Sequence, residues 1–176
     1  MRVLRAALAV VVMSVVALFA VAAPAQAAQF TTTLISQWNG KCLDAEANSN
    51  FNGATVQLWS CSGQNNQDWK MIELGNSFFK IVNVKFNRCL DADTGAITRD
   101  GTRVQLWDCS GRDNQKWFKL DLNQGTILEN YMASDLRNDT SAAVLDANAN
   151  NPNNGTNIQI WRFLGYQNQY WILGIL

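Results

Sequence analysis

The sequence contains no histidine, few charged residues and no excess of either charge. None of its 176 residues is His, 14 Lys and Arg balance 14 Asp and Glu, and charged residues make up 16% of the chain. Without His, Ser-His-Asp and Cys-His catalytic triads and imidazole metal sites are excluded. A neutral chain without a basic stretch also lacks the charge pattern of a nucleic-acid-binding protein. Seven Trp residues, in contrast, are a high count that needs an explanation.

The N-terminal segment, residues 1–27, has the pattern of a secretory signal peptide. Two Arg residues within the first five positions precede an apolar run from Ala6 to Ala23, and an A-x-A site ends at Ala27. A retained membrane anchor is the alternative, because about 18 apolar residues are borderline for spanning a bilayer. No stop-transfer charges follow, so we expect cleavage after Ala27, secretion, and no membrane insertion of the remaining chain.

The remaining residues, 28–176, suit a single domain with a stable core. They number 149 and include 12 basic and 14 acidic residues, all four Cys, 20 Asn and 11 Gln. Export favours paired disulfides over metal ligation or redox chemistry for the four Cys. The many side-chain amides suggest a surface that acts through neutral hydrogen bonds. No phosphate-binding loop or metal-ligand cluster occurs, and we expect no cofactor.

Three internal repeats cover most of this domain. Each repeat contains a Leu-Asp-Ala motif, then a Gln-Leu-Trp or Gln-Ile-Trp motif, then an Asn-Gln-x-Trp motif. The motifs lie at 42–45, 56–61 and 66–69, at 89–92, 104–109 and 114–117, and at 144–147, 158–163 and 168–171. The Asp of the first motif precedes the last Trp by 25, 26 and 25 residues. We expect repeats over about 31–75, 76–121 and 122–176, with extra length in the third before its Asp.

Each repeat consists of short β-rich runs separated by turn-forming residues. In the first repeat these runs are roughly 31–38, 41–44, 55–59 and 68–73. No segment resembles a long helix. Four strands in each of three repeats predict an all-β, closed architecture with pseudo-threefold symmetry, because closure removes exposed strand edges.

The four Cys fit the same register. Cys42 and Cys61 lie 19 residues apart in the first repeat, and Cys89 and Cys109 lie 20 apart in the second. Both equivalent positions of the third repeat are apolar, Val144 and Phe163. This joint replacement favours one disulfide within each of the first two repeats, although crossed pairings stay open at this point.

The period-two rule for strands divides six of the seven Trp into two classes. In the second motifs the aliphatic residues occupy one face, and Trp59, Trp107 and Trp161 share the opposite, solvent-facing side with Gln. An exposed Trp repeated three times indicates binding, or else a cover over a disulfide or loop. The other class, Trp69, Trp117 and Trp171, follows Gln at i−2, shares a face with that Gln and is expected in the core. Trp38 lies outside the pattern.

The thrice-repeated Gln-x-Trp, combined with Cys-Leu-Asp and Gln-Leu-Trp, resembles the ricin B-type lectin family. The resemblance covers about residues 34–173. It implies a β-trefoil, a six-stranded barrel capped by three hairpins. It also implies sugar pockets built from the Asp, the mid-repeat aromatic residue and the Asn before Gln-x-Trp, with the Gln orienting the Asp.

Transferred to this chain, the resemblance implies three pockets that all retain every named position. Members of the family commonly keep only one or two. Pocket one is Asp44, Gln57, Trp59, Asn66 and Gln67, pocket two is Asp91, Gln105, Trp107, Asn114 and Gln115, and pocket three is Asp146, Gln159, Trp161, Asn168 and Gln169. Each Asp could instead hold local backbone amides in a turn.

Three functions follow from these observations. The leading hypothesis is a secreted, non-catalytic lectin that binds galactose- or xylose-type glycans multivalently, alone or beside a partner enzyme or toxin subunit. A glycoside hydrolase would need a carboxylate pair at one site, whereas we expect the acidic residues to be distributed one per repeat, as binding demands. An interaction or inhibitor protein, or an accessory subunit, on the same scaffold without sugar binding is the third possibility, because fold does not fix function.

Overall fold

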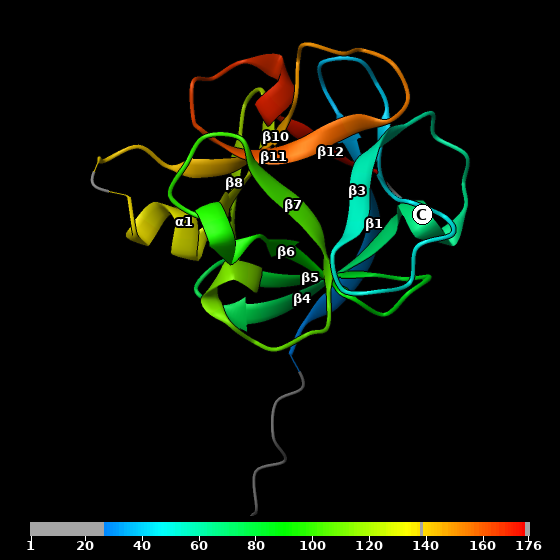
Figure 1. Cartoon of the computed structure of the whole chain (residues 1–176), viewed down its shortest axis with the longest axis horizontal. Helices are drawn as coiled ribbons and strands as arrows, with labels where there is room; N and C mark the ends of the chain where they lie inside the picture. The colour runs from blue at the N-terminus through cyan, green and yellow to red at the C-terminus, as the bar shows by residue number, and fades with distance from the viewer. Residues whose placement is uncertain (1–26, 138, 175–176) are drawn as a thin grey trace, which may run out of the picture.

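The computed structural model describes residues 27–137 and 139–174, which fold into one twelve-stranded sheet with pseudo-threefold symmetry (Figure 1). The predicted signal peptide therefore lies outside the described residues apart from its last position. The strands are β1 Gln29–Ser36, β2 Cys42–Ala45, β3 Ala54–Trp59, β4 Asp68–Gly75, β5 Phe78–Asn83, β6 Cys89–Ala92, β7 Thr102–Trp107, β8 Trp117–Leu122, β9 Gly125–Asn130, β10 Ala143–Ala147, β11 Thr156–Arg162 and β12 Trp171–Gly174.

Six of the strands close into a barrel. The antiparallel pairings run β1 to β4, β4 to β5, β5 to β8, β8 to β9, β9 to β12, and β12 back to β1. No strand of this ring has a free edge, which is the advantage that closure gives an all-β chain. The expected six-stranded barrel is confirmed.

Three hairpins cap one end of the barrel. They are β2–β3, β6–β7 and β10–β11, and the second strands of the three hairpins also pair with one another. Figure 1 shows β3, β7 and β11 arranged around a common centre. Together with the barrel, these hairpins confirm the closed, pseudo-threefold architecture that the repeats predicted and the β-trefoil that the family resemblance implied.

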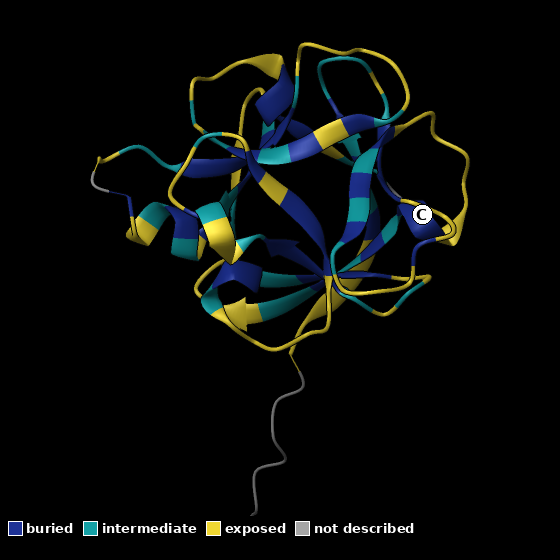
Figure 2. Ribbon diagram, in the orientation of Figure 1, coloured by how far each residue is buried: buried dark blue, intermediate teal, exposed yellow. Residues whose placement is uncertain are grey.

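The core confirms the two classes of Trp. Trp69, Trp117 and Trp171 have no exposed surface, and their indole N–H groups donate to the backbone oxygens of Leu43, Leu90 and Leu145 at 3.0 to 3.1 Å. These bonds tie each barrel strand to the hairpin of the same repeat. Burial is concentrated along the strands, while the connecting loops are exposed (Figure 2).

The aliphatic residues of the second motifs and Trp38 complete the core. The aliphatic residues of the second motifs are fully buried, as alternation predicted, in a cluster that also contains the three core Trp. Trp38, which sequence left without a role, is half-buried and packs against this cluster. It therefore covers the core.

The third repeat departs from the symmetry between β9 and β10. Where the first two repeats make tight turns, this segment contains the five-residue helix α1 Tyr131–Asp135, the only α-helix in the described part of the chain. Asn130 caps it, accepting a hydrogen bond from Ala133 N at 3.1 Å. The extra length that sequence found before Asp146 is this insertion.

Candidate functional site

Each predicted pocket begins on a two-stranded hairpin. In the first, Cys42 pairs with Trp59 and Asp44 pairs with Gln57, so the Asp, Gln and Trp share one face. The second hairpin has the same register, and in the third Val144 takes the place of the Cys. Short 3₁₀ turns, η1 Asn65–Gln67, η3 Asp113–Gln115 and η4 Gln167–Gln169, then bring the Asn-Gln pair back to the Asp.

The Asp of pocket one is held by three side-chain amides. Gln57 Nε2 donates to Asp44 Oδ1 at 3.1 Å, and the amides of Asn66 and Gln67 both donate to Oδ2 at 2.8 Å. Asn66 also donates to the Ala45 carbonyl at 2.9 Å. A nearly buried carboxylate is thereby fixed in one orientation with a free acceptor direction on Oδ1.

The other two pockets repeat this arrangement. Asp91 accepts from Gln105, Asn114 and Gln115 at 3.1, 2.8 and 2.9 Å. Asp146 accepts from Gln159, Asn168 and Gln169 at 2.8, 2.8 and 3.0 Å. All fifteen predicted residues are therefore brought together in three groups of five.

The last Gln of each group positions the Asp. Gln67 Nε2 also donates to the Ser60 carbonyl at 3.1 Å, and its Oε1 accepts from the Ser62 N–H at 2.7 Å. Gln115 and Gln169 make the equivalent contacts. These Gln residues are buried in 3₁₀ turns, where strand alternation does not apply. The prediction that each shares a strand face with the Trp two positions later is therefore wrong, and each Gln donates to the Asp of its group.

Burial raises the pKa of all three carboxyl groups. Loss of hydration is the main cause for Asp44 and Asp91, and the amide hydrogen bonds oppose it. In pocket three loss of hydration raises the pKa of Asp146 to about 6, with the nearby Asp100 charge adding a smaller effect in the same direction. Hydrogen bonds from three neutral amides thus do not fully replace the lost water.

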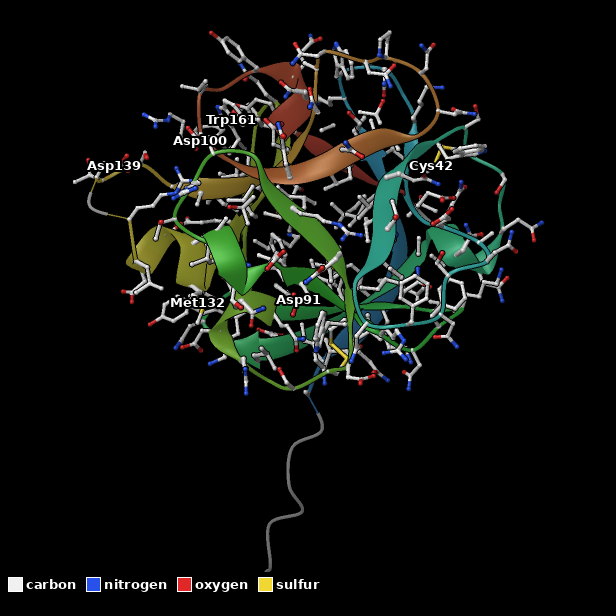
Figure 3. The ribbon with its side chains drawn as sticks, in the orientation of Figure 1. Cys42, Asp91, Asp100, Met132, Asp139 and Trp161 are labelled. Carbon is white, nitrogen blue, oxygen red and sulfur yellow. A yellow bond between two sulfur atoms is a disulfide. The ribbon has the colours of Figure 1, made fainter. Side chains whose placement is uncertain are left out.

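The three solvent-facing Trp stand beside these carboxylates. Trp59 and Trp107 are 42% and 40% exposed, and Trp161, labelled in Figure 3, is half-buried. The hollows that they line have volumes of about 390, 380 and 230 Å³ for pockets one, two and three. An indole face and an oriented carboxylate therefore line each hollow.

A neighbouring repeat supports each of these Trp. At pocket two, Asn52 Oδ1 accepts from the N–H of Asp108, the residue after Trp107, at 2.7 Å. Gly53 has a positive φ of 87°, and a side chain there would meet the Trp107 ring at 3.9 Å. The equivalent acceptors are Asp100 for pocket three, from Arg162 N at 2.9 Å, and Asn154 for pocket one, from Ser60 N at 3.0 Å.

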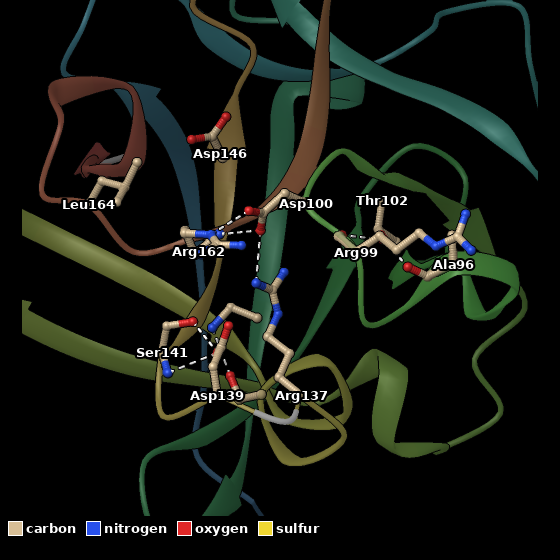
Figure 4. A network of polar contacts seen from close by, with 12 residues as sticks. Ala96, Arg99, Asp100, Thr102, Arg137, Asp139, Ser141, Asp146, Arg162 and Leu164 are labelled. Atoms are coloured by element: carbon tan, nitrogen blue, oxygen red, sulfur yellow. Dashed lines mark hydrogen bonds and ion pairs between the residues drawn. The ribbon is translucent and has the colours of Figure 1, made fainter.

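The support of pocket three is charged, whereas the other two are amides. Asp100 accepts from Arg137 Nη1 at 2.8 Å and from Arg162 Nε at 2.5 Å, as Figure 4 shows. Burial acts to raise the pKa of Asp100, but these hydrogen bonds outweigh it and hold the pKa below its usual value. Asp100 therefore stays ionised and ties the third repeat's insertion to β11.

The pocket rims contain residues that sequence reasoning missed. Pockets one and two each have a second carboxylate two positions after the Asp, Glu46 and Asp93, while pocket three has Asn148 there. The expectation of one acidic residue per pocket is therefore wrong for the first two. A further rim position is occupied by Gln64 in pocket one, Arg112 in pocket two and Tyr166 in pocket three. These residues lie in loops that differ between repeats, so the repeated motifs gave no indication of them.

Two disulfides close the hairpins of the first two repeats. Cys42 is bonded to Cys61 and Cys89 to Cys109, with Cα–Cα distances of 5.1 Å in both. The pairing within repeats is confirmed, and no free Cys remains among the described residues. In the third repeat Val144 and Phe163 belong to a small apolar cluster with Ile127 and Tyr170.

The described residues offer neither a metal-binding cluster nor a membrane-spanning helix. Residues 27–137 and 139–174 include no group of three or more Cys, Asp or Glu arranged to hold a metal ion. Within the same ranges, no helix has the length and apolar character needed to cross a membrane.

The closed barrel with three hairpin caps defines a β-trefoil protein, and comparisons identify its family. A family model, the ricin-type β-trefoil lectin domain-like family, matches residues 24–107. ThreeFoil, a designed 3-fold symmetric protein, superposes with a TM-score of 0.75 and 31% identity over 83% of this chain and 99% of its own. The chain belongs to the ricin-type β-trefoil lectin domain-like family.

Two further structures are similar over most of the chain. An exo-β-1,3-galactanase from Clostridium thermocellum has a TM-score of 0.74 and 27% identity, and the match covers 87% of this chain and 31% of the galactanase. The Macrolepiota procera ricin B-like lectin, in complex with lactose, has a TM-score of 0.67 and 16% identity over 84% and 96% of the two chains. The likeness to the Macrolepiota lectin shows the fold alone. No curated protein matches the chain.

Proposed function

We propose that the protein is a secreted, non-catalytic lectin that binds carbohydrate through three pockets. One observation carries this proposal: three times, a carboxylate fixed by three amides lies beside a partly exposed indole face. The family supports carbohydrate binding in general, and the Macrolepiota relative is a lectin in complex with lactose.

The chemistry of the pockets suits a neutral, hydroxyl-rich ligand. An Asp carboxylate with an open acceptor direction can accept hydrogen bonds from adjacent sugar hydroxyls. The indole offers an apolar surface against which the C–H face of a pyranose can stack. Each pocket therefore combines acceptors with an apolar platform, as a sugar ring requires.

Three shallow pockets on one rigid body favour multivalent binding. Each site taken alone should bind weakly, since few groups contact the ligand. A galactose- or xylose-type polymer, or a glycan-coated surface, can engage several pockets at once and gain affinity without new contacts. The barrel joins the three hairpins rigidly, which fixes the spacing of the sites.

A glycan array with matched variants tests this proposal. The triple variant Trp59→Ala, Trp107→Ala and Trp161→Ala removes all three platforms, and we expect it to lose binding while keeping the thermal unfolding temperature of the parent. Phe51→Ala, which removes an aromatic side chain that is 57% exposed and outside the pockets, serves as the control and should keep binding. Sugar binding that survives the triple variant would contradict the pocket assignment.

Catalysis needs a separate test because pockets one and two contain a second carboxylate. Glu46 accepts from Ser49 Oγ at 2.8 Å and Asp93 accepts from Gly95 N at 2.9 Å, so both carboxylates are held in local turns. We expect no release of reducing sugar from galactan or xylan by the purified protein. Release that disappears in Glu46→Gln or Asp93→Asn would show hydrolysis instead.

An accessory role beside an enzyme or toxin subunit is the second candidate. The match to the galactanase covers only 31% of that chain, so this fold occurs there as one part of a larger enzyme.

Secretion rests on residues 1–27 and is supported by the two disulfides, which persist in oxidising compartments. N-terminal sequencing of protein from the culture medium would test cleavage after Ala27. No glycan bound at all would favour an interaction or inhibitor protein.

A further inference from the structure

A fourth cleft lies at the insertion of the third repeat, outside the three equivalent pockets. It has a volume of about 560 Å³, more than any of the three. Its floor is the outer face of β5, β8 and β9, and its wall is α1 with the chain that leads into β10. In Figure 3 the labels of Met132 and Asp139 mark α1 and this chain.

The floor of the cleft breaks the threefold symmetry of the barrel. Phe78 on β5 pairs with Phe118 on β8, which pairs with Glu129 on β9, so the three side chains form a row on one face. The symmetry-related rows are Thr31, Lys70 and Val82, and Gly125, Ile172 and Ile35. Two aromatic rings beside a carboxylate therefore occur in one row of the three, at the position where the insertion is found.

Three aromatic rings in the cleft pack at right or steep angles. The Phe78 ring centre lies 5.4 Å from that of Phe118 and 5.4 Å from that of Tyr131, and the second contact is edge-on. Tyr131 begins α1 and is 39% exposed, while both Phe rings are half-buried. Lys116 Nζ lies 6.0 Å from the centre of the Tyr131 ring. This ring thus already accepts a cation on one of its faces.

The wall of the cleft is anchored to the rest of the domain. Ser134 Oγ accepts from Ala143 N at 2.9 Å, which ties α1 to the start of β10. Arg137 is bonded to Asp100 of the second repeat, as described above and shown in Figure 4. These contacts hold the insertion against the barrel.

Hydrogen-bond acceptors dominate the polar lining of the cleft. Its ionised groups are the carboxylates of Glu129, Asp135 and Asp139. The cations nearby are engaged elsewhere: Lys116 pairs with Asp113 at 2.7 Å and Arg137 pairs with Asp100. Glu129 and Asp135 form no ion pair with a described residue. The lining is therefore rich in negative charge and in ring faces, and it lacks cationic donors.

We infer that this cleft binds an organic cation, an ammonium or guanidinium group on an apolar or hydroxylated body. The charged group would donate hydrogen bonds to the carboxylates that line the cleft, Glu129 and Asp135. The body would lie on the rings of Phe78, Phe118 and Tyr131, which attract a cation through their π faces. A neutral sugar could bond to the hydroxyl groups of this lining, but it would leave the carboxylates without a counter-charge.

Isothermal titration on the full chain tests the inference, in the background of the triple Trp→Ala variant so that the three pockets are silent. The probes are glucosamine, agmatine and N-acetylglucosamine, which supply a cationic sugar, a cation with an apolar body and a neutral sugar. We expect glucosamine or agmatine to bind, with affinity falling as salt is raised, and N-acetylglucosamine to bind at least about tenfold more weakly. Tighter binding of glucosamine would show that the cationic group belongs to a sugar, and tighter binding of agmatine would show that it belongs to an apolar body.

Matched variants locate the site. Glu129→Gln and Tyr131→Ala should each weaken binding about tenfold or more, because each removes a charge-assisted or ring contact. Asp135→Asn, at an exposed position, serves if Glu129→Gln does not fold, and Glu73→Gln on the β4–β5 hairpin is the control that should bind like the parent. The inference is overturned if no cation binds at millimolar concentration, if N-acetylglucosamine binds equally well, or if Glu129→Gln and Asp135→Asn both bind like the parent.

Discussion

Pockets two and three share an inner layer but differ in the shell around it. In both, a buried Asp accepts three amide hydrogen bonds within 2.8 to 3.1 Å. Around pocket two lie a disulfide, the carboxylate of Asp93 and the cation of Arg112. Around pocket three lie an apolar contact, the amide of Asn148 and the ring of Tyr166, which is 64% exposed. The same inner layer therefore forms beside a disulfide in one repeat and beside an apolar contact in the other.

The difference shows what fixes the carboxylate in each repeat. In pocket three Phe163 packs edge-on against Tyr170 at 5.9 Å, next to the buried Val144. Val144 and Phe163 stand at the positions of Cys89 and Cys109, and β10 and β11 keep the register of the other hairpins without a bridge. A charged rim and a neutral, aromatic rim on the same inner layer predict that the two pockets prefer different glycans.

The largest expected effect comes from removing a bridge. The double variant Cys89→Ala and Cys109→Ala should lower the free energy of unfolding by about 3 kcal/mol, because it opens a loop of about 20 residues in the unfolded chain. Urea denaturation measures this loss. Binding at pocket two should weaken and binding at pocket three should persist when each is tested with the other two platform Trp replaced by Ala.

The corresponding change in the third repeat is Phe163→Ala. If the apolar contact does the work of the bridge, this variant should lose about 2–3 kcal/mol of unfolding free energy, since a half-buried ring is removed. It should weaken pocket three and leave pocket two unchanged. The comparison would fail if Phe163→Ala weakened binding at pocket two. It would also fail if neither Phe163→Ala nor the double Cys→Ala variant lost stability.

A smaller but general effect is expected from the central carboxylates. Asp146→Asn and Asp91→Asn should each reduce affinity at their own pocket roughly 10- to 100-fold, because hydrogen bonds to a charged group contribute about 1.5–3 kcal/mol. The new amide also brings an N–H toward the Gln and Asn donors. Calorimetry on single-pocket proteins checks this, and Asp121→Asn, at an exposed ion pair with Lys119, is the control. Equal affinity in parent and variants would place the ligand elsewhere.

The sequence predicts the inner layer well because repetition and strand alternation act on the same residues. In the run 56–59, alternation placed Gln57 and Trp59 on the outer face, and the hairpin register puts them beside Asp44. Alternation placed Gln67 on one face with Trp69, but Gln67 lies in a 3₁₀ turn and bonds to Asp44, a partner that only the family resemblance indicated.

The rims and the fourth cleft could not be predicted in the same way. Arg112 and Tyr166 occupy one position of the repeat but share no chemistry, so repetition carries no information about them. The row of Phe78, Phe118 and Glu129 joins three strands through pairings that only the closed barrel creates. Long-range pairing between repeats is what a single sequence does not contain.

An effect of about tenfold is expected from pH at pocket three. The pKa of Asp146 is raised to about 6 by burial, so the carboxylate is mostly ionised at pH 7 and mostly protonated at pH 5. Affinity that depends on the ionised form should fall about tenfold between these values. Because the pKa is raised on folding, ionisation opposes folding, and the contribution of Asp146 to stability is lost as pH rises through about 6.

Binding and stability should therefore change in opposite directions on acidification, as far as Asp146 is concerned. Carboxyl ¹³C NMR of Asp146 gives its pKa, and calorimetry at pH 5 and 7 gives the affinity. Asp100→Asn should lower the pKa of Asp146, since the Asp100 charge raises it. An affinity at pocket three that is constant from pH 7 to 5 would contradict an ionised acceptor in the complex.

The smallest effect concerns a hydrogen bond that pocket three lacks. Asn83 Nδ2 donates to the backbone oxygen of Asn66 at 3.0 Å, and Asn130 Nδ2 donates to that of Asn114 at 2.9 Å, so each joins a repeat to the pocket before it. The equivalent residue beside pocket three is Ser36, which is fully buried and whose Oγ has no partner among the described residues. Ser36→Asn supplies the missing donor for Asn168 and should stabilise the fold by about 1 kcal/mol. Thermal unfolding measures this gain, and a lower unfolding temperature would mean that the shorter side chain at Ser36 is required by packing.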